Sequence, residues 1–354
     1  MTATSAPICL AVLNPGGRDA PIDYADGPGK PGEASHPPVN YHAYAAATNG
    51  AFFDKADAIL SQRDRFHAVV VLIRSRVGIS LKAIRKLKKA GCFVLASWKE
   101  SGPYQIADQL QSRQALQAYG EILALADGIL SPTMVLPPHC GPIPASEFER
   151  KTRFIPTPYP LEDPGWDFSV PIPDRRGIML GTRQFFVPTR NHLQALARCA
   201  AISAAWDLPV TVINGDKRKG AALLKQWETS FPESRLRVID RPLSYPEYLR
   251  LMASHRLVFQ LDRSHVPGQV AGDAGLCRIL CAGGNSALER LIDPDLADDG
   301  TESSLRIEEK LEIVLTNEEA YREAVASASH RAKDRAGFLS VAEVIGRFIR
   351  ELQE

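Results

Sequence analysis

Glycines crowd one segment that is otherwise apolar and would suit a helix. Gly268, Gly272 and Gly275 fall close together, and each costs about 1 kcal/mol relative to alanine inside a helix, so helix propensity does not explain them. The free amides of a helix that begins after Pro267 would carry positive partial charge and suit a phosphate. Asp273, one helical turn later, could accept a hydrogen bond from a sugar hydroxyl. The alternative is tight packing of this helix in an α/β core, and glycine spacing alone does not decide between the two.

Two further glycine turns follow apolar strands, where an α/β sheet meets its ligand. Gly16 and Gly17 come directly after the first apolar run, and Arg183 closes a Gly-Thr-Arg turn after a later one, with Arg190 shortly beyond it. A guanidinium can hold phosphate oxygens through paired hydrogen bonds. Either arginine taken singly is more typical of a surface charge, and it is the pair at a glycine turn that indicates a binding site.

A third group of reactive side chains follows the apolar residues 93–96. The sequence continues Ser-Trp-Lys-Glu-Ser, which places Trp98 and Glu100 at the end of a strand. Glu100 is the nearest candidate for a general base on this side. Asp19 and His42, in or beside the long loop 15–40, are weaker candidates.

Alternating strands and helices must position these groups. Continuous apolar runs are typical of parallel strands that are covered on both faces, and right-handed crossovers turn such a series into a doubly wound sheet. In the first half we expect strands at 7–14, 67–73, 93–96 and 128–130, with helices at 41–62, 80–90 and 105–126. The first of these helices is either continuous or interrupted at Asn49-Gly50.

The same pattern restarts after the proline-rich segment 155–176, which is typical of an interdomain linker. There we expect strands at 177–180, 209–213, 236–239, 257–261 and 278–281, helices from 191 and at 248–253, and an amphipathic C-terminal helix at 338–352. The predicted domains are 1–154 and 177–336, and the C-terminal segment 337–354 is expected to pack on the first of them.

The composition is that of a soluble globular protein. The 354 residues are 45% hydrophobic and 23% charged, with a formal net charge of +1. These values exclude wholesale disorder and give no global charge for binding nucleic acid. The length exceeds one ordinary core and indicates two domains.

Cysteine usage and hydropathy favour a cytoplasmic setting. None of the six cysteines forms a CxxC pair, and scattered cysteines favour a reduced compartment. Cys277 and Cys281 lie four residues apart without a second pair, so no metal site is expected. No apolar run reaches the roughly 20 residues that span a bilayer. The basic helix at 80–90 would permit peripheral contact with an anionic membrane, although a solvated helix that covers a sheet is the commoner case.

This layout resembles the GT-B fold of glycosyltransferases, in which two Rossmann-like doubly wound domains flank a cleft and a C-terminal helix docks back. The second half is similar to the group 1 set, family 4, whose members carry E-G-F-G-L-x-x-x-E-A, then a glycine pair and a further glutamate. Here the segment from His265 to Ala274 reads HVPGQVAGDA, and Gly283, Gly284 and Glu289 match the pair and the acid.

The resemblance implies a nucleotide-sugar as donor substrate, with no separate cofactor and no metal. Arg183 and Arg190 stand at the family's arginine and lysine positions, and with the amides of Gly268 and Gln269 they would bind the diphosphate. Asp273 would hold the ribose.

The family's first acid is replaced by a histidine in this sequence. His265 is therefore a candidate catalytic residue together with Glu100, and it would contact a phosphate as a cation or a sugar hydroxyl when neutral. Gly16, Gly17 and Trp98 would lie on the acceptor side, where the family often has a histidine at the position of Trp98.

The sequence therefore predicts a glycosyltransferase that moves a sugar from a nucleotide donor to an unidentified acceptor, be it glycan, lipid, protein or small molecule. The family resemblance favours retention of configuration. Two alternatives stay open. One is another GT-B enzyme, such as a nucleotide-sugar epimerase or a phosphorylase, and the other is a GT-B protein that binds a nucleotide or glycan without turnover.

Overall fold

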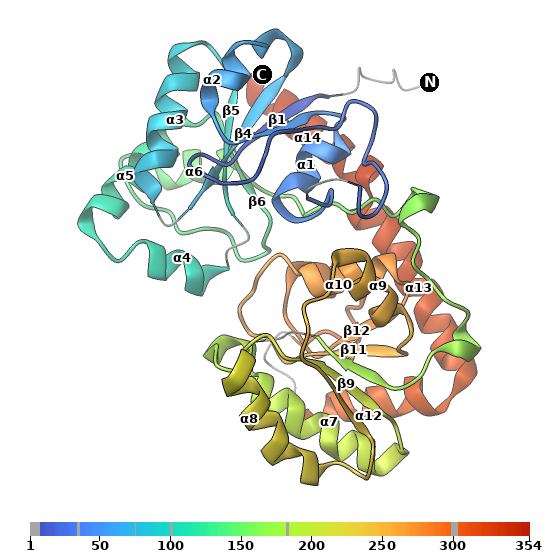
Figure 1. The fold of residues 1–354 in the computed structure, drawn as a ribbon. Helices are drawn as coiled ribbons and strands as arrows, with labels where there is room; N and C mark the ends of the chain where they lie inside the picture. Colours follow the sequence, from blue (N-terminus) through green and yellow to red (C-terminus); the bar gives the residue numbers. More distant parts are fainter. Residues whose placement is uncertain (1–7, 34–35, 75, 100–101, 182–183, 299–303) are drawn as a thin grey trace. The chain divides into compact units, whose positions relative to one another are not determined.

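The computed structural model describes residues 8–33, 36–74, 76–99, 102–181, 184–298 and 304–354. The chain divides into two compact units, each built around its own sheet (Figure 1). Unit 1 comprises Met1–Glu162 and Ala336–Glu354, and unit 2 comprises Asp163–Arg335. The proline-rich segment expected as a linker is thus shared between them, and its later part, including the buried Trp166, belongs to unit 2.

Unit 1 contains a seven-stranded sheet, sheet 1, in the order β2-β3-β1-β4-β5-β6-β7. All neighbouring strands are parallel except β2 and β3. The strands are β1 (Leu10–Leu13), β2 (Ile22–Asp23), β3 (Ala51–Phe53), β4 (Ala68–Ile73), β5 (Val94–Trp98), β6 (Gly128–Ser131) and β7 (Thr152–Phe154).

Helices cover both faces of sheet 1, as the apolar strands require. Alternate residues of β1 and β4 enter two separate cores: one with α2, α3, α5 and α6, the other with α1 and the C-terminal α14. The helices are α1 (Ala43–Ala47), α2 (Ala56–Leu60), α3 (Val77–Lys89), α4 (Pro103–Gln109), α5 (Arg113–Leu125), α6 (Ala145–Lys151) and α14 (Phe338–Gln353), with 3-10 turns η1 (Asn40–His42) and η2 (Arg63–Arg65).

The segment expected as a helix at 41–62 is interrupted after Asn49-Gly50, and the single helix expected at 105–126 is wrong. The helix at 41–62 is interrupted by β3, which pairs in parallel with β1. The position before this strand must be glycine, because a Cβ on Gly50 would lie 1.9 Å from the carbonyl oxygen of Leu10. The helix at 105–126 is divided into α4 and α5, because Ser112 caps a new helix by accepting a hydrogen bond from the amide of Ala115.

Unit 2 contains a five-stranded parallel sheet, sheet 2, in the order β10-β9-β8-β11-β12. Its strands are β8 (Ile178–Leu180), β9 (Val210–Ile213), β10 (Leu236–Ile239), β11 (Leu257–Phe259) and β12 (Leu280–Ala282). Its helices are α7 (His192–Trp206), α8 (Lys217–Trp227), α9 (Tyr245–Ala253), α10 (Gln269–Leu276), α11 (Ala287–Ile292), α12 (Ser304–Thr316) and α13 (Glu318–Ala336), with 3-10 turns η3 (Pro164–Trp166), η4 (Ile172–Asp174), η5 (Pro188–Arg190) and η6 (Glu228–Ser230).

The expected pair of Rossmann-like, doubly wound α/β layers is confirmed. In each sheet the chain begins near the middle and winds outward in both directions, which brings the carboxyl ends of neighbouring parallel strands to one edge. In the part of the chain that the structure describes, no helix is both long and apolar enough to cross a membrane.

Candidate functional site

The carboxyl edge of sheet 2 gathers residues from three neighbouring strand ends. Arg190 lies in the segment after β8, His265 and Gly268 follow β11, and Asn285 follows β12. Backbone hydrogen bonds join these segments: the amide of Arg263 donates to the carbonyl of Thr189 over 2.8 Å, and the amide of Asn285 to that of Asp262 over 3.0 Å. Groups that lie far apart in the sequence are thereby held in one place.

Arg190 is ion-paired with a buried carboxylate that the sequence did not single out. Its Nη1 donates to Oδ2 of Asp262, a residue only 2% exposed. The other carboxylate oxygen, Oδ1, accepts from the amide of Ser264 over 2.7 Å. Among the described residues, none accepts from Nε of Arg190. Asp262 therefore orients the guanidinium and balances part of its charge.

A second arginine is held in the same way beside it. Arg263 donates from Nη2 to Asp298, which is 1% exposed, and from Nη1 to the carbonyl of Gly283 over 2.8 Å. Sequence reasoning missed Asp262, Arg263 and Asp298. For the first two a signal existed, because a polar Asp-Arg pair directly follows the buried run that ends at Leu261.

His265 is held in a left-handed backbone conformation, with φ of 50°. Its amide donates to Oδ1 of Asn285 over 3.0 Å, and its ring Nε2 lies 3.1 Å from Nδ2 of the same residue. Burial, followed by the charges of Arg290 and Arg263, lowers the pKa of the imidazole. The neutral ring is therefore the form at neutral pH.

Gly268 stands at the start of α10 and cannot be another residue without strain. Its φ is 103°, and a Cβ there would lie 2.4 Å from Oγ of Ser286. The close packing that the sequence left as an alternative is therefore real at this glycine. Gln269 follows on the exposed first position of α10. Phosphate binding by the amides of this first turn stays a prediction of the sequence.

Asp273, the predicted ribose-binding residue, is buried and already hydrogen-bonded within unit 2. It is 1% exposed, and its Oδ1 accepts a 2.5 Å hydrogen bond from the hydroxyl of Tyr245, at the start of α9. The ring of Tyr245 in turn lies 6.4 Å from that of Trp166. The contact between Asp273 and a ribose stays a prediction.

Glu289, which matches the family's final acid, ties together the turn after β12. It is fully buried and accepts from the amide of Gly284 over 3.0 Å and from Oγ of Ser286 over 2.7 Å. Ser286 and Glu289 form a capping box for α11. Burial raises the pKa of Glu289. This acid therefore shapes the backbone around the site.

In unit 1, the glycine turn after β1 is a type II turn. Pro15 and Gly16 occupy its central positions, Gly16 has φ of 72°, and the amide of Gly17 donates to the carbonyl of Asn14 over 2.9 Å. A Cβ on Gly17 would lie 2.5 Å from the side-chain nitrogen of Asn14. The local backbone geometry therefore explains why glycine occupies both positions, independently of any ligand.

Polar side chains follow the three adjacent strands β1, β4 and β5 at the carboxyl edge of sheet 1. The amide nitrogen of Asn14, after β1, donates to Asp19 over 3.1 Å, and Arg74, after β4, donates to its amide oxygen over 3.2 Å. The hydroxyl of Tyr41 also donates to Asp19, over 3.2 Å. Lys99, after β5, places its Nζ 3.6 Å from the centre of the Tyr41 ring.

Two predicted site residues, Trp98 and His42, lie in the core of unit 1, and two others are not among the described residues. Trp98 is 3% exposed, and its ring packs 5.2 Å from that of Tyr119, so it belongs to the core rather than to an acceptor surface. Arg183 and Glu100 lie outside the described residues. His42 is fully buried, and burial lowers the pKa of its imidazole to about 2, which leaves it a core residue beside Phe52.

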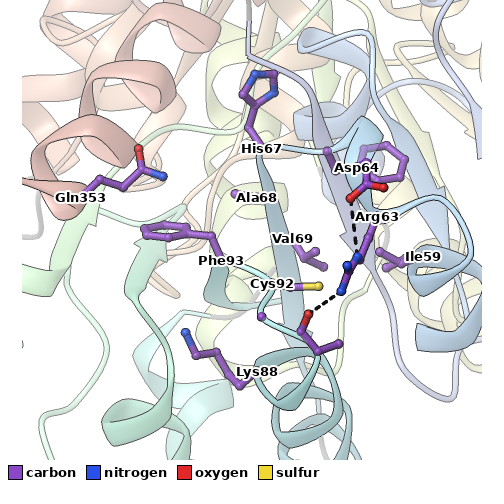
Figure 2. Close-up of a pocket in the computed structure, with 13 residues that line it drawn as sticks. Ile59, Arg63, Asp64, His67, Ala68, Val69, Lys88, Cys92, Phe93 and Gln353 are labelled. Atoms are coloured by element: carbon purple, nitrogen blue, oxygen red, sulfur yellow. Dashed lines mark hydrogen bonds and ion pairs between the residues drawn. The ribbon is translucent and has the colours of Figure 1, made fainter.

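Unit 1 also contains a cavity of about 640 Å³, and none of the residues of the Asn14 cluster lines it (Figure 2). It is lined by residues at the beginning of β4, such as Ala68, and by Phe93 just before β5. It therefore opens at the amino edge of sheet 1, opposite Asn14 and Arg74. Arg63 in its wall donates to the carbonyl of Ala90 over 3.0 Å. Within the described ranges, no cluster of histidine, cysteine and acidic residues could hold a metal ion.

No family model matches the sequence, and no curated protein matches it either. Solved structures do match. A sucrose-phosphate synthase from Thermosynechococcus elongatus is similar over 98% of this chain and 99% of its own, at 13% identity and a TM-score of 0.60. An alpha-glucosyltransferase in complex with UDP is similar over 97% of this chain and all of its own, at 8% identity and a TM-score of 0.60.

Anabaena HepE in complex with UDP-glucose is similar over 83% of this chain and 81% of its own, at 11% identity and a TM-score of 0.57. At these identities the matches establish the fold. The chain has the GT-B fold, as its sequence predicted.

Proposed function

We propose that this protein is a glycosyltransferase that moves a sugar from a nucleotide donor to an acceptor hydroxyl. The proposal rests on three features that share the carboxyl edge of sheet 2. Arg190 is ion-paired with Asp262, His265 is neutral, and the first turn of α10 follows Gly268. Structures with the same fold that hold UDP or UDP-glucose support the nature of the donor.

The chemistry we propose needs positive charge where the leaving group develops negative charge. When the bond between the sugar's C1 and the diphosphate breaks, charge grows on the diphosphate, and fixed donors stabilise it most when they are already oriented. Arg190 is oriented by Asp262, and the α10 amides are fixed by the helix. Arg183, outside the described residues, would add a second cation. With these donors, the proposed reaction requires no metal ion.

Unit 1 supports an acceptor that carries a negatively charged group. Arg74 and Lys99 follow adjacent strands and bring two cationic side chains to this edge, where Asp19 accepts hydrogen bonds from Asn14 and Tyr41. Helix α3 begins beside Arg74 with no side-chain cap and no acid in its first turn. A helix start of this kind favours an anion. Among the matched structures are a sucrose-phosphate synthase and a trehalose-phosphate synthase from Burkholderia xenovorans, names that are in line with this proposal.

The direct test is incubation with a panel of UDP-, GDP- and ADP-sugars, with and without sugar phosphates as acceptors. We expect slow release of a nucleoside diphosphate with one donor, accelerated by the acceptor. The matched variant is the double substitution Arg190→Gln with Asp262→Asn, which removes both charges but keeps a polar pair. Loss of a preorganised donor of this kind typically costs about 100-fold or more in rate.

The outcomes separate the proposed transferase from its alternatives. Thermal stabilisation by UDP without release of diphosphate from any sugar nucleotide would identify a binding protein. Interconversion of the sugar without an acceptor would identify an epimerase, and release of a sugar 1-phosphate from a glycan with inorganic phosphate would identify a phosphorylase. Unchanged turnover in the double variant would remove our assignment of the site.

A further inference from the structure

Asn285 contacts His265 twice, and the two contacts together determine which way its amide points. It lies in the turn after β12 and is 3% exposed. One of its side-chain atoms faces the backbone amide of His265 at 3.0 Å, and the other faces the ring Nε2 at 3.1 Å. A backbone N–H can only donate, so the atom facing it must be the carbonyl oxygen, Oδ1. The atom facing the ring is then the amide nitrogen, Nδ2.

The orientation of this amide decides the protonation of the imidazole. Nδ2 carries two hydrogens and cannot accept, so Nε2 must offer its lone pair. A neutral imidazole has one N–H and one lone pair, which leaves the hydrogen on Nδ1. In the imidazolium form, N–H groups would face each other across this contact. The geometry therefore selects one tautomer and opposes the cation.

We propose that Asn285 is a positioning residue that holds His265 as a neutral hydrogen-bond donor through Nδ1, so that His265 does not act as a general acid or base. The lone pair that a base would need is occupied by Asn285. Among the described residues none accepts a hydrogen bond from Nδ1, and a phosphate or sugar oxygen of the donor substrate is the partner that we assign to it. This last assignment rests on the proposed function, whereas the tautomer does not.

The charges around the ring act in the same direction. Arg263 lies two residues before His265 and Arg290 lies on α11, and both lower the pKa of the ring, while Asp262 opposes them. Burial has the largest effect. The left-handed backbone of His265 is costly for a histidine, and such strain is typical of residues held in place for a function. The Asn285 contact to its amide stabilises that conformation.

The tautomer can be measured without any substrate. Long-range ¹H–¹⁵N correlation spectra of the full chain distinguish a protonated from a lone-pair nitrogen in each histidine ring, and the His265→Asn variant assigns the signal. We expect a protonated Nδ1 and a lone-pair Nε2 that persist from about pH 6 to 8, a range in which an ordinary histidine titrates. A hydrogen on Nε2, or on both nitrogens, over this range would overturn the proposal. In Asn285→Asp, a carboxylate would accept from Nε2, so we expect the ring to become doubly protonated.

Two substitutions of His265 separate hydrogen-bond donation from acid-base catalysis. An asparagine can place its amide N–H near the position of Nδ1 and tolerates positive φ, whereas a glutamine reaches towards the position of Nε2. We expect His265→Asn to retain more donor turnover than His265→Gln, which should lose about tenfold or more, as for a lost hydrogen bond to a charged group. A general base would make both variants equally poor, and this result would overturn the proposed role.

The same variants distinguish a failure of this proposal from a failure of the proposed function. If the protein neither binds nor turns over sugar nucleotides, the spectra still decide the tautomer. If it does turn them over, a histidine-type titration of kcat/KM that disappears in His265→Asn would contradict the donor role. Thermal unfolding of each variant verifies that the fold is intact.

Discussion

Two buried carboxylates, Asp262 and Asp298, each hold an arginine at the carboxyl edge of sheet 2. Removal of one member of such a pair leaves an unpaired buried charge, which typically costs about 3 to 5 kcal/mol. A single Arg190→Ala substitution would therefore mix lost binding with lost stability. For this reason we test the site with the double substitution Arg190→Gln and Asp262→Asn, which leaves no unpaired charge.

Asp273 offers a sharper single substitution. In Asp273→Asn the remaining carbonyl oxygen can still accept from the hydroxyl of Tyr245, so we expect an unchanged melting temperature. A hydrogen bond to a charged group contributes about 1.5 to 3 kcal/mol, and we expect UDP to bind about tenfold or more weakly by isothermal titration calorimetry.

Tyr245→Phe is the matched control for this prediction. It removes the internal hydrogen bond of Asp273 while it leaves the carboxylate in place. If Asp273 serves the ribose, the phenylalanine variant keeps UDP affinity closer to the wild type than the asparagine variant does. Equal affinity for UDP in Asp273→Asn and the wild type would remove this residue from the site.

At the scale of elements, the sequence predicted most of both sheets because their strands are continuous apolar runs. The capping boxes at Ser244 and Ser286 also carried their signal in the sequence. Short elements were missed for a physical reason. The three residues of β3 become a strand only because β1 lies beside them, and no local pattern records that neighbour.

The edge of sheet 1 gives a prediction about the acceptor. We expect Arg74→Gln to raise KM for a phosphorylated acceptor about tenfold, as for loss of one charge-assisted hydrogen bond, and to leave KM for the nucleotide donor unchanged. Lys89→Gln is the control, because Lys89 is exposed at the opposite end of α3. If Arg74→Gln leaves KM for phosphorylated acceptors unchanged, as Lys89→Gln should, the acceptor is not held by its negative charge.

A buried acid directly after helix α11 makes stability depend on pH. Burial raises the pKa of Asp293 to about 7, from an ordinary value of 3.8. The folded state therefore keeps a proton that the unfolded state loses, so the free energy of unfolding falls as pH rises from about 4 to 7, by up to about 1.4 kcal/mol per pH unit. Glu289, whose pKa is also raised, acts with the same sign.

Urea unfolding between pH 4 and 8 tests this dependence. Asp293→Asn keeps an acceptor for the amide of Cys281 and removes the titration, so we expect a shallower fall in stability with pH. Glu233→Gln, at an exposed position elsewhere in unit 2, should retain the full dependence. A steep fall that survives in Asp293→Asn would show that another group is responsible.

At the scale of the whole molecule, the C-terminal helix α14 completes the core of unit 1. Ile345 is fully buried there, whereas Leu339 on the same helix is 68% exposed. We expect Ile345→Ala to cost about 2 to 5 kcal/mol of unfolding free energy and Leu339→Ala to change it by less than about 0.5 kcal/mol. Equal effects in chemical denaturation would contradict the packing of α14.

The order of elements along the chain predicted two sheets, and the glycine motif located the segment after β11. The partners of the site residues were not predictable in the same way. Asp262 is 72 residues from Arg190, and Asp298 is 35 residues from Arg263. No local pattern reports such pairs, because the fold alone brings them together. The burial of Trp98 and Asp273 likewise depends on neighbours that are remote in the sequence.

Hydrogen–deuterium exchange with and without saturating UDP tests the central claim most directly. We predict slower exchange at the first turn of α10, residues 268–272, because a bound diphosphate would accept hydrogen bonds at the start of this helix. We also predict slower exchange in the turn 283–286, because the bound ligand would stabilise the internal hydrogen bonds of this turn beside it. Protection confined to unit 1, for instance around the cavity at the beginning of β4, would contradict the account, and so would unchanged exchange at 268–272 when calorimetry shows UDP bound.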